Sequence, residues 1–73
     1  MTLFIDDLNE LPQQLRAERI RQNKTQAEIT NAAYVSKNMV YLTETGQTTP
    51  SITILRDLAR ALGYDEIVIK TIH

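Results

Sequence analysis

The chain has 73 residues, eight basic and nine acidic side chains, and no cysteine. This length fits one domain and leaves no room for a second functional module. Disulfides and a metal-ligand cluster are excluded as sources of stability, and no apolar stretch fits a signal peptide or a membrane span. We therefore expect a cytoplasmic protein without a membrane partner, and expect oligomerisation to stabilise so small a domain.

Charge is unevenly distributed along the chain. Residues 1–14 carry three acidic side chains and no basic one, whereas residues 15–40 carry five basic and two acidic side chains. A basic segment is compatible with a nucleic-acid partner even though the net charge is -1. Ordinary solvated helix charges would explain the same composition, and the two interpretations remain open at this point.

The first predicted element is a helix that begins between Asn9 and Leu11. Pro12 fits only the first turn of a helix, because deeper in the helix it would remove a hydrogen bond and clash with the preceding turn. The helix should run to about Gln22, where Asn23 is suited to a left-handed C-cap.

Two further short helices follow. Thr25 is a good N-cap for residues 26–33, and Glu28 three positions later completes a capping box. Ser36 is the next N-cap and opens a helix that reaches about Glu44.

A fourth helix lies between Ser51, which caps it, and Gly63, which ends it. Gly46 and Pro50 mark the connection before this helix. Apolar residues recur at helical spacing on one face, namely Leu55, Leu58, Ala59 and Leu62. We expect this face to be buried.

Residues 66–72 are predicted to form a β-strand. Five of the six positions from 67 to 72 hold a β-branched residue, which favours a strand over a helix. A single strand is not stable alone, so it needs a partner. The partner could be the N-terminal segment 3–5 or a second chain, and a tail that merely covers the core is the remaining alternative.

The second and third helices have the arrangement of a helix-turn-helix. The inward positions are Ile29, Ala33, Val40 and Thr43, with Val35 in the turn. The outer face of the third helix carries Lys37, Asn38 and Tyr41, together with Leu42. Lys can donate to guanine, and Asn can pair with adenine through two hydrogen bonds in the major groove.

Taken in order, these positions resemble the Cro-type (XRE) helix-turn-helix regulators over roughly residues 15–63. The matching positions are Leu15, Arg16, Arg19, Thr25, Gln26, Ile29, Ala33, Val35, Ser36, Lys37, Asn38, Val40, Tyr41, Glu44, Gly46, Pro50, Ser51 and the segment 55–63. The resemblance implies an all-α, four-to-five-helix domain of the lambda-repressor type with a short C-terminal β-strand. Residues 1–73 would form this single domain, with the helix-turn-helix at about 25–45.

The resemblance also implies a function and a site. The protein would bind double-stranded operator DNA as a homodimer and repress transcription, with no enzymatic activity and no cofactor. The implied DNA-binding residues are Thr25, Gln26, Ser36, Lys37, Asn38, Tyr41 and Gln47. Arg19 could instead form a structural ion pair with Glu44.

Four positions depart from the family pattern. Tyr34 replaces the usual turn glycine, where a left-handed φ costs a non-glycine residue about 1 kcal/mol, so the turn could be reshaped. Lys24 and Thr43 replace apolar residues, and Leu42 replaces a polar or basic one. The alternative function is therefore a protein-interaction module that does not bind DNA and uses Leu42 as an exposed anchor.

The C-terminal segment resembles that of short HipB-type antitoxins, which end in an alternating apolar strand. This likeness implies an autoregulating repressor that also binds and neutralises a toxin, such as a HipA-type kinase. A phage-type repressor without a toxin partner is the alternative. We expect the strand to form the dimer by pairing antiparallel with its copy, through Ile67, Val68, Ile69, Lys70 and Thr71.

Overall fold

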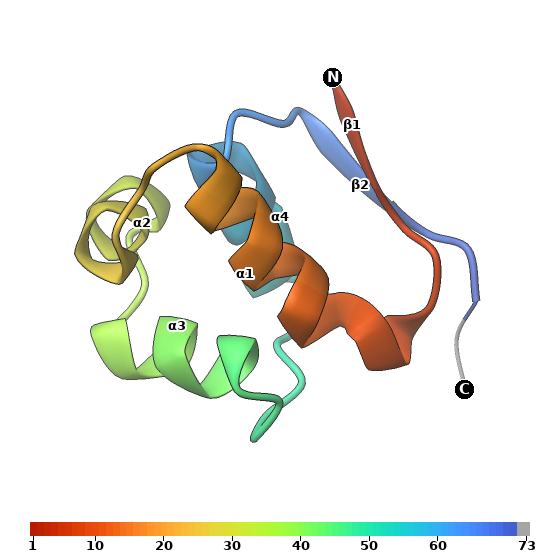
Figure 1. Ribbon diagram of the computed structural model, residues 1–73, viewed down its shortest axis with the longest axis horizontal. Coiled ribbons are helices and arrows are strands. Elements are labelled where there is room, and N and C mark those ends of the chain that lie inside the picture. Colours follow the sequence, from red (N-terminus) through yellow and green to blue (C-terminus); the bar gives the residue numbers. More distant parts are fainter. Residues whose placement is uncertain (72–73) are drawn as a thin grey trace.

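The computed structural model describes residues 1–71, and it contains four α-helices packed beside a two-stranded sheet (Figure 1). In chain order the elements are β1 (Thr2–Ile5), a 3-10 turn η1 (Leu8–Glu10), α1 (Leu11–Arg21), α2 (Gln26–Ala33), α3 (Lys37–Glu44), α4 (Ile52–Ala61) and β2 (Glu66–Ile69). The four predicted helices are confirmed. The fold is mostly helical, as predicted, but besides the predicted C-terminal strand it has a strand at the N-terminus, β1.

The helix boundaries follow from local capping. The Thr25 hydroxyl accepts a hydrogen bond from the Glu28 amide at 3.1 Å, and the Glu28 carboxylate accepts one from the Thr25 amide at 3.0 Å, which completes the predicted capping box. The hydroxyls of Ser36 and Ser51 cap α3 and α4 by accepting hydrogen bonds from the Met39 and Ile54 amides, respectively. Each cap satisfies amides that the first helical turn leaves unpaired, so these short helices have defined starts.

The core lies where α1, α2, α3 and α4 meet, and it contains the apolar positions predicted from helical spacing. The buried residues of the helical part include Leu11, Leu15, Ile29, Ala33, Val40, Leu55, Leu58, Ala59 and Leu62. Val35 in the turn is half-buried against them. The inner surfaces of α2 and α3 are therefore fixed against α1 and α4, and their outer surfaces face solvent.

The C-terminal strand pairs with the N-terminal segment of the same chain, one of the two partners predicted for it. β1 and β2 are parallel, with Leu3 opposite Ile67 and Ile5 opposite Ile69. Leu3 and Ile5 are buried, and Ile67 and Ile69 pack on the core from the same face of the sheet. The intervening Phe4 and Val68 are exposed, as the alternation of side chains along a strand requires.

The predicted strand, 66–72, is longer than β2. The strand ends at Ile69, because the chain bends there while its backbone still bonds to the N-terminal segment. The Lys70 amide donates to the Ile5 carbonyl at 2.9 Å, and the Thr71 carbonyl accepts from the Leu8 amide at 2.9 Å. Residue 72 lies outside the described residues.

The end of α1 is fastened to the end of α4 by side chains that the sequence did not identify. Lys24 Nζ donates to the Ala61 carbonyl at 2.9 Å, and Gln22 Nε2 donates to the Leu62 carbonyl at 2.8 Å. These two donors satisfy carbonyls that the last turn of a helix leaves free. Lys24 thus has a structural role in place of the apolar residue usual at its position.

We expect Leu58→Ala to lower the free energy of unfolding by about 2 to 5 kcal/mol, because the side chain is removed from a closed core and leaves a cavity. Leu58 is only 3% exposed. Urea unfolding followed by circular dichroism measures the change. A loss below about 1 kcal/mol, the range of an ordinary surface substitution, would contradict this packing.

Glu18 predicts a pH dependence of stability. Its carboxylate accepts hydrogen bonds from Arg21, Tyr64 and Gln22, and the Arg21 guanidinium beside it contributes most to lowering the pKa of Glu18 from 4.5 to about 2. Because the folded pKa lies below the unfolded one, this stabilisation is present above about pH 4.5 and is lost as the pH falls toward about 2.

Glu18→Gln should therefore flatten the decline of the urea midpoint over this acidic range. The amide oxygen of the variant can still accept the Tyr64 hydroxyl. A variant whose midpoint falls as steeply as that of the unmodified chain would contradict the assignment.

Candidate nucleic-acid interface

The outer face of α3 presents polar side chains to solvent, as the sequence predicted. Lys37 and Asn38 are exposed, and Tyr41 is half-exposed. On the opposite face, Val40 and Thr43 are each 1% exposed and pack into the core. The buried face fixes the helix in rotation, so the same three side chains always point away from the domain.

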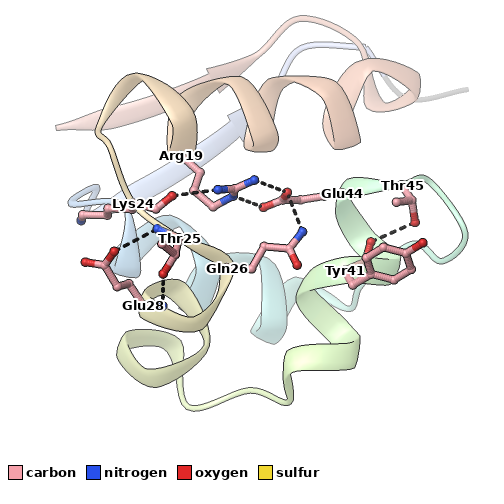
Figure 2. A network of polar contacts seen from close by, with 8 residues as sticks. All are labelled: Arg19, Lys24, Thr25, Gln26, Glu28, Tyr41, Glu44 and Thr45. Atoms are coloured by element: carbon pink, nitrogen blue, oxygen red, sulfur yellow. Dashed lines mark hydrogen bonds and ion pairs between the residues drawn. The ribbon is translucent and has the colours of Figure 1, made fainter.

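A polar network in the space between α1, α2 and α3 joins the three helices (Figure 2). Arg19 Nε donates to Glu44 Oε2 at 2.8 Å, and Arg19 Nη2 donates to Glu44 Oε1 at 3.1 Å. The side chains are 13% and 5% exposed, respectively, so the pair is largely shielded from water. Arg19 Nη1 also donates to the Lys24 carbonyl at 2.7 Å. The predicted ion pair is therefore present, with both ends of the guanidinium satisfied.

Gln26 takes part in the same network. Its Nε2 donates to Glu44 Oε1 at 3.2 Å, and the side chain is only partly exposed. The sequence predicted Gln26 as a DNA contact, and this bond gives its amide a second role in orienting α2 against α3. Thr25 beside it is exposed, with its hydroxyl accepting from the Glu28 amide.

The turn between α2 and α3 keeps its left-handed residue even though that residue is a tyrosine. Tyr34 has φ 57° and ψ 35°, so the turn is not reshaped. A left-handed backbone is unfavourable for a bulky side chain, and here the ring escapes steric conflict because it is 94% exposed. The helix-turn-helix geometry is thus retained at a conformational cost.

Leu42 differs from its predicted placement. It was expected on the outer face of α3, yet it is half-buried. It lies four residues, about one helical turn, after Asn38 and is therefore at the edge of the exposed stripe, where it is partly covered. Leu42 is therefore a poor candidate for an exposed anchor that binds a protein partner.

The remaining predicted contacts lie at the two ends of α3. Ser36 is exposed and caps the helix, with its hydroxyl accepting from the Met39 amide at 3.1 Å. Gln47 follows the helix, is exposed, and donates to the Thr45 hydroxyl at 3.0 Å. At the first end, Thr25, Gln26 and Lys37 line one open hollow of 580 Å³. The structure thus brings these three together, while Gln47 lies at the far end of α3.

Most basic side chains near this face already have partners. Arg19 is bound to Glu44, Arg21 to Glu18, and Lys24 to the Ala61 carbonyl. Within residues 1–71, Arg16 and Lys37 form no ion pair and no side-chain hydrogen bond, and both are exposed. The sequence indicated a basic segment of five residues, but fewer of these charges are free than their number implied.

The predicted dimerisation residues lie together at one side of the domain. Ile67, Val68 and Ile69 form most of β2. Lys70 instead pairs with Asp6 at 3.6 Å and lies over the Phe4 ring at 5.5 Å, and the Thr71 carbonyl accepts from the Leu8 amide. No helix in the described part of the chain is long and apolar enough to cross a membrane.

Two short helices joined by a left-handed turn, the second with a polar outer face, define a DNA-binding domain of the helix-turn-helix class. The family model of the helix-turn-helix domain matches residues 10–69, and the chain belongs to that family. It is accordingly a DNA-binding regulator, and the family is typically non-enzymatic. No curated protein and no solved structure matches the chain.

Glu44→Gln should destabilise the domain by about 3 to 5 kcal/mol, because it leaves the Arg19 charge without its carboxylate in a nearly closed site. Urea unfolding measures the loss. The double variant Arg19→Met with Glu44→Gln should recover part of it, because no unpaired charge is then buried. Additive losses in the double variant would contradict a coupled pair.

Proposed function

We propose that the protein is a sequence-specific transcriptional repressor that binds a palindromic operator as a homodimer. The observation that carries the proposal is the position of Lys37 and Asn38, which are exposed on a helix whose opposite face is locked into the core. A helix presented in this way can enter the major groove, where these two side chain types discriminate bases. Thr25, Gln26, Ser36, Tyr41 and Gln47 complete the proposed contact surface.

Lys37→Ala and Asn38→Ala should each weaken binding to a specific site by about 1 to 3 kcal/mol without unfolding the domain. The assay is a mobility shift with the DNA upstream of the chain's own coding sequence, with circular dichroism as the check on folding. Arg60→Ala is the matched control, because Arg60 is also exposed but lies in the last turn of α4, where it pairs with Asp57. If all three variants bind the DNA with the same affinity as the unmodified chain, the proposed interface is wrong.

The dimer is proposed to form at the free edge of β2. The sheet in residues 1–71 has two strands, so β2 has β1 on one edge only. The Lys70 amide points to β1, and successive amides along a strand point to opposite edges, so those of Ile67 and Ile69 face outward. A two-fold axis at Val68 would pair Ile67 with Ile69 of a second copy and satisfy both edges.

Apolar surface beside this edge supports the same interface. A hollow of 320 Å³ is lined by Ile52, Leu55, Arg56, Ile67 and Ile69. Ile52 is 70% exposed, which is unusual for a large apolar side chain beside a strand edge. A second copy would cover this hollow while its β2 extends the sheet. The two-fold axis could also set two copies of α3 about 34 to 36 Å apart, the spacing of adjacent major grooves.

Val68→Glu should convert dimers to monomers, because two carboxylates would lie directly opposite each other across the axis. Phe4→Glu is the control. Phe4 lies on the same exposed face of the sheet as Val68, but it belongs to β1, one strand away from the proposed interface. Sedimentation equilibrium measures the mass. If Val68→Glu and Phe4→Glu have the same mass as the unmodified chain, the dimer does not form at this edge.

The finer biological role is a HipB-like antitoxin that represses its own transcription and neutralises a toxin, with a HipA-type kinase as one candidate. Support for it is the apolar alternating C-terminal strand, which is present as β2. Co-purification of the chain with the product of the neighbouring coding sequence tests this role. A phage-type repressor without a toxin would bind DNA in the same way but would co-purify alone.

A further inference from the structure

A long hollow runs beside α3 on the side where α1 lies. Its volume is 810 Å³, and its lining includes Pro12, Arg16 and Ile20 of α1 and, at the end of α3, Thr45 and Gly46. Arg16 lies one turn before Arg19, which bonds to Glu44 of α3. Arg16 is therefore on the flank of α1 that faces α3, but it remains exposed.

This hollow adjoins the one at the start of α3. Ile20 lines both, and the second hollow also includes Thr25, Gln26 and Lys37. At the other end, the Thr45 hydroxyl donates to the Tyr41 carbonyl at 2.9 Å, which places Thr45 one turn beyond the exposed tyrosine (Figure 2). We call these two adjoining hollows, one beside Lys37 and the other beside Glu44 and Gly46, the trough.

The trough has one free cation near each end. Lys37 lies at the start of α3, and Arg16 lies opposite its end. Between them, the charges of Arg19 and Glu44 neutralise each other. A ligand that follows the trough would therefore need at least two negative groups separated by about the length of α3, which is ~12 Å for eight residues at 1.5 Å each.

We propose that this trough holds the sugar-phosphate backbone of one DNA strand, with Arg16 binding a phosphate at the edge of the half-site. One strand carries a phosphate about every 3.4 Å along the duplex axis, so several lie within the trough. Ile20, which is 48% exposed between the two cations, provides an apolar surface for deoxyribose carbons. The inference rests on the proposed DNA-binding function and adds a positioning contact from α1.

The position of the trough beside α3 favours DNA over an acidic protein segment as its ligand. The trough adjoins the exposed face of α3 through Lys37 and Thr45, so a duplex that places its major groove on α3 must bring a backbone alongside. A protein ligand would have to occupy the same space in competition with the duplex.

The test compares the salt dependence of DNA binding for the full chain and for Arg16→Ala, Arg16→Lys and the control Arg60→Ala, an exposed arginine of α4. Two probes are used, namely duplex DNA from upstream of the chain's own coding sequence and a random duplex of equal length. Because each phosphate contact contributes about -0.9 to the slope of log K against log salt, Arg16→Ala should make the slope of a dimer shallower by about 1.8 on both probes. Arg16→Lys should keep the slope, and Arg60→Ala should not change it.

The outcomes separate this inference from the function on which it rests. If Lys37→Ala weakens binding but Arg16→Ala leaves affinity and slope unchanged, the trough does not hold DNA and the proposed function stands. An unchanged slope for Arg16→Ala would favour an acidic protein segment as the ligand of the trough. Weaker binding without a change in slope would also overturn the phosphate contact. If the unmodified chain binds neither probe, the proposed function itself fails.

Discussion

The bidentate pair between Arg19 and Glu44 determines how α3, the second helix of the helix-turn-helix, is presented. Its four hydrogen bonds, including those of Gln26 and the Lys24 carbonyl, link α1, α2 and α3 at one point. A shielded pair of charges is stabilising only when its remaining donors and acceptors are satisfied, and here they are. The geometric precision of this contact fixes α3 relative to α2. The same contact removes Arg19 from the charges available to a ligand.

The second constraint is the pairing of β1 with β2, which joins the N-terminal and C-terminal segments. A two-stranded sheet is marginal by itself, so its stability comes from the inner side chains that join the helical core, such as Ile5, which is fully buried. This pairing uses one edge of β2, and the other edge has no strand beside it in residues 1–71. This short strand therefore holds the N-terminus on the core, and in the proposed dimer its other edge would bind the same strand of a second copy.

The sequence predicted the parts of the structure that depend on neighbouring residues. The caps at Thr25, Ser36 and Ser51 and the inward positions of α3 follow from local hydrogen bonding and helical spacing. It left open the partner of β2, which lies about sixty residues away in the chain, and missed the bond from Lys24 to the end of α4. For Leu42, the family pattern indicated an exposed position, while packing of α3 half-buries the side chain. Apart from the pair of Arg19 with Glu44, which the sequence predicted, the free and paired basic side chains could be distinguished only once their partners were placed.

Charge placement reconciles a net charge of -1 with DNA binding. Glu18 and Glu44 are each bound by an arginine, and Asp6 is paired with Lys70 beside the sheet, so these carboxylates are compensated within the fold. What remains beside α3 is a small positive field from Arg16 and Lys37. So few free charges give weak sequence-independent attraction to a polyanion. Under the proposed function, occupancy of an operator then depends on base contacts from α3 and on two copies binding together, since joining two weak half-site interactions multiplies their effect. In that proposal, the edge of β2 is as important to DNA recognition as the side chains that would contact the bases.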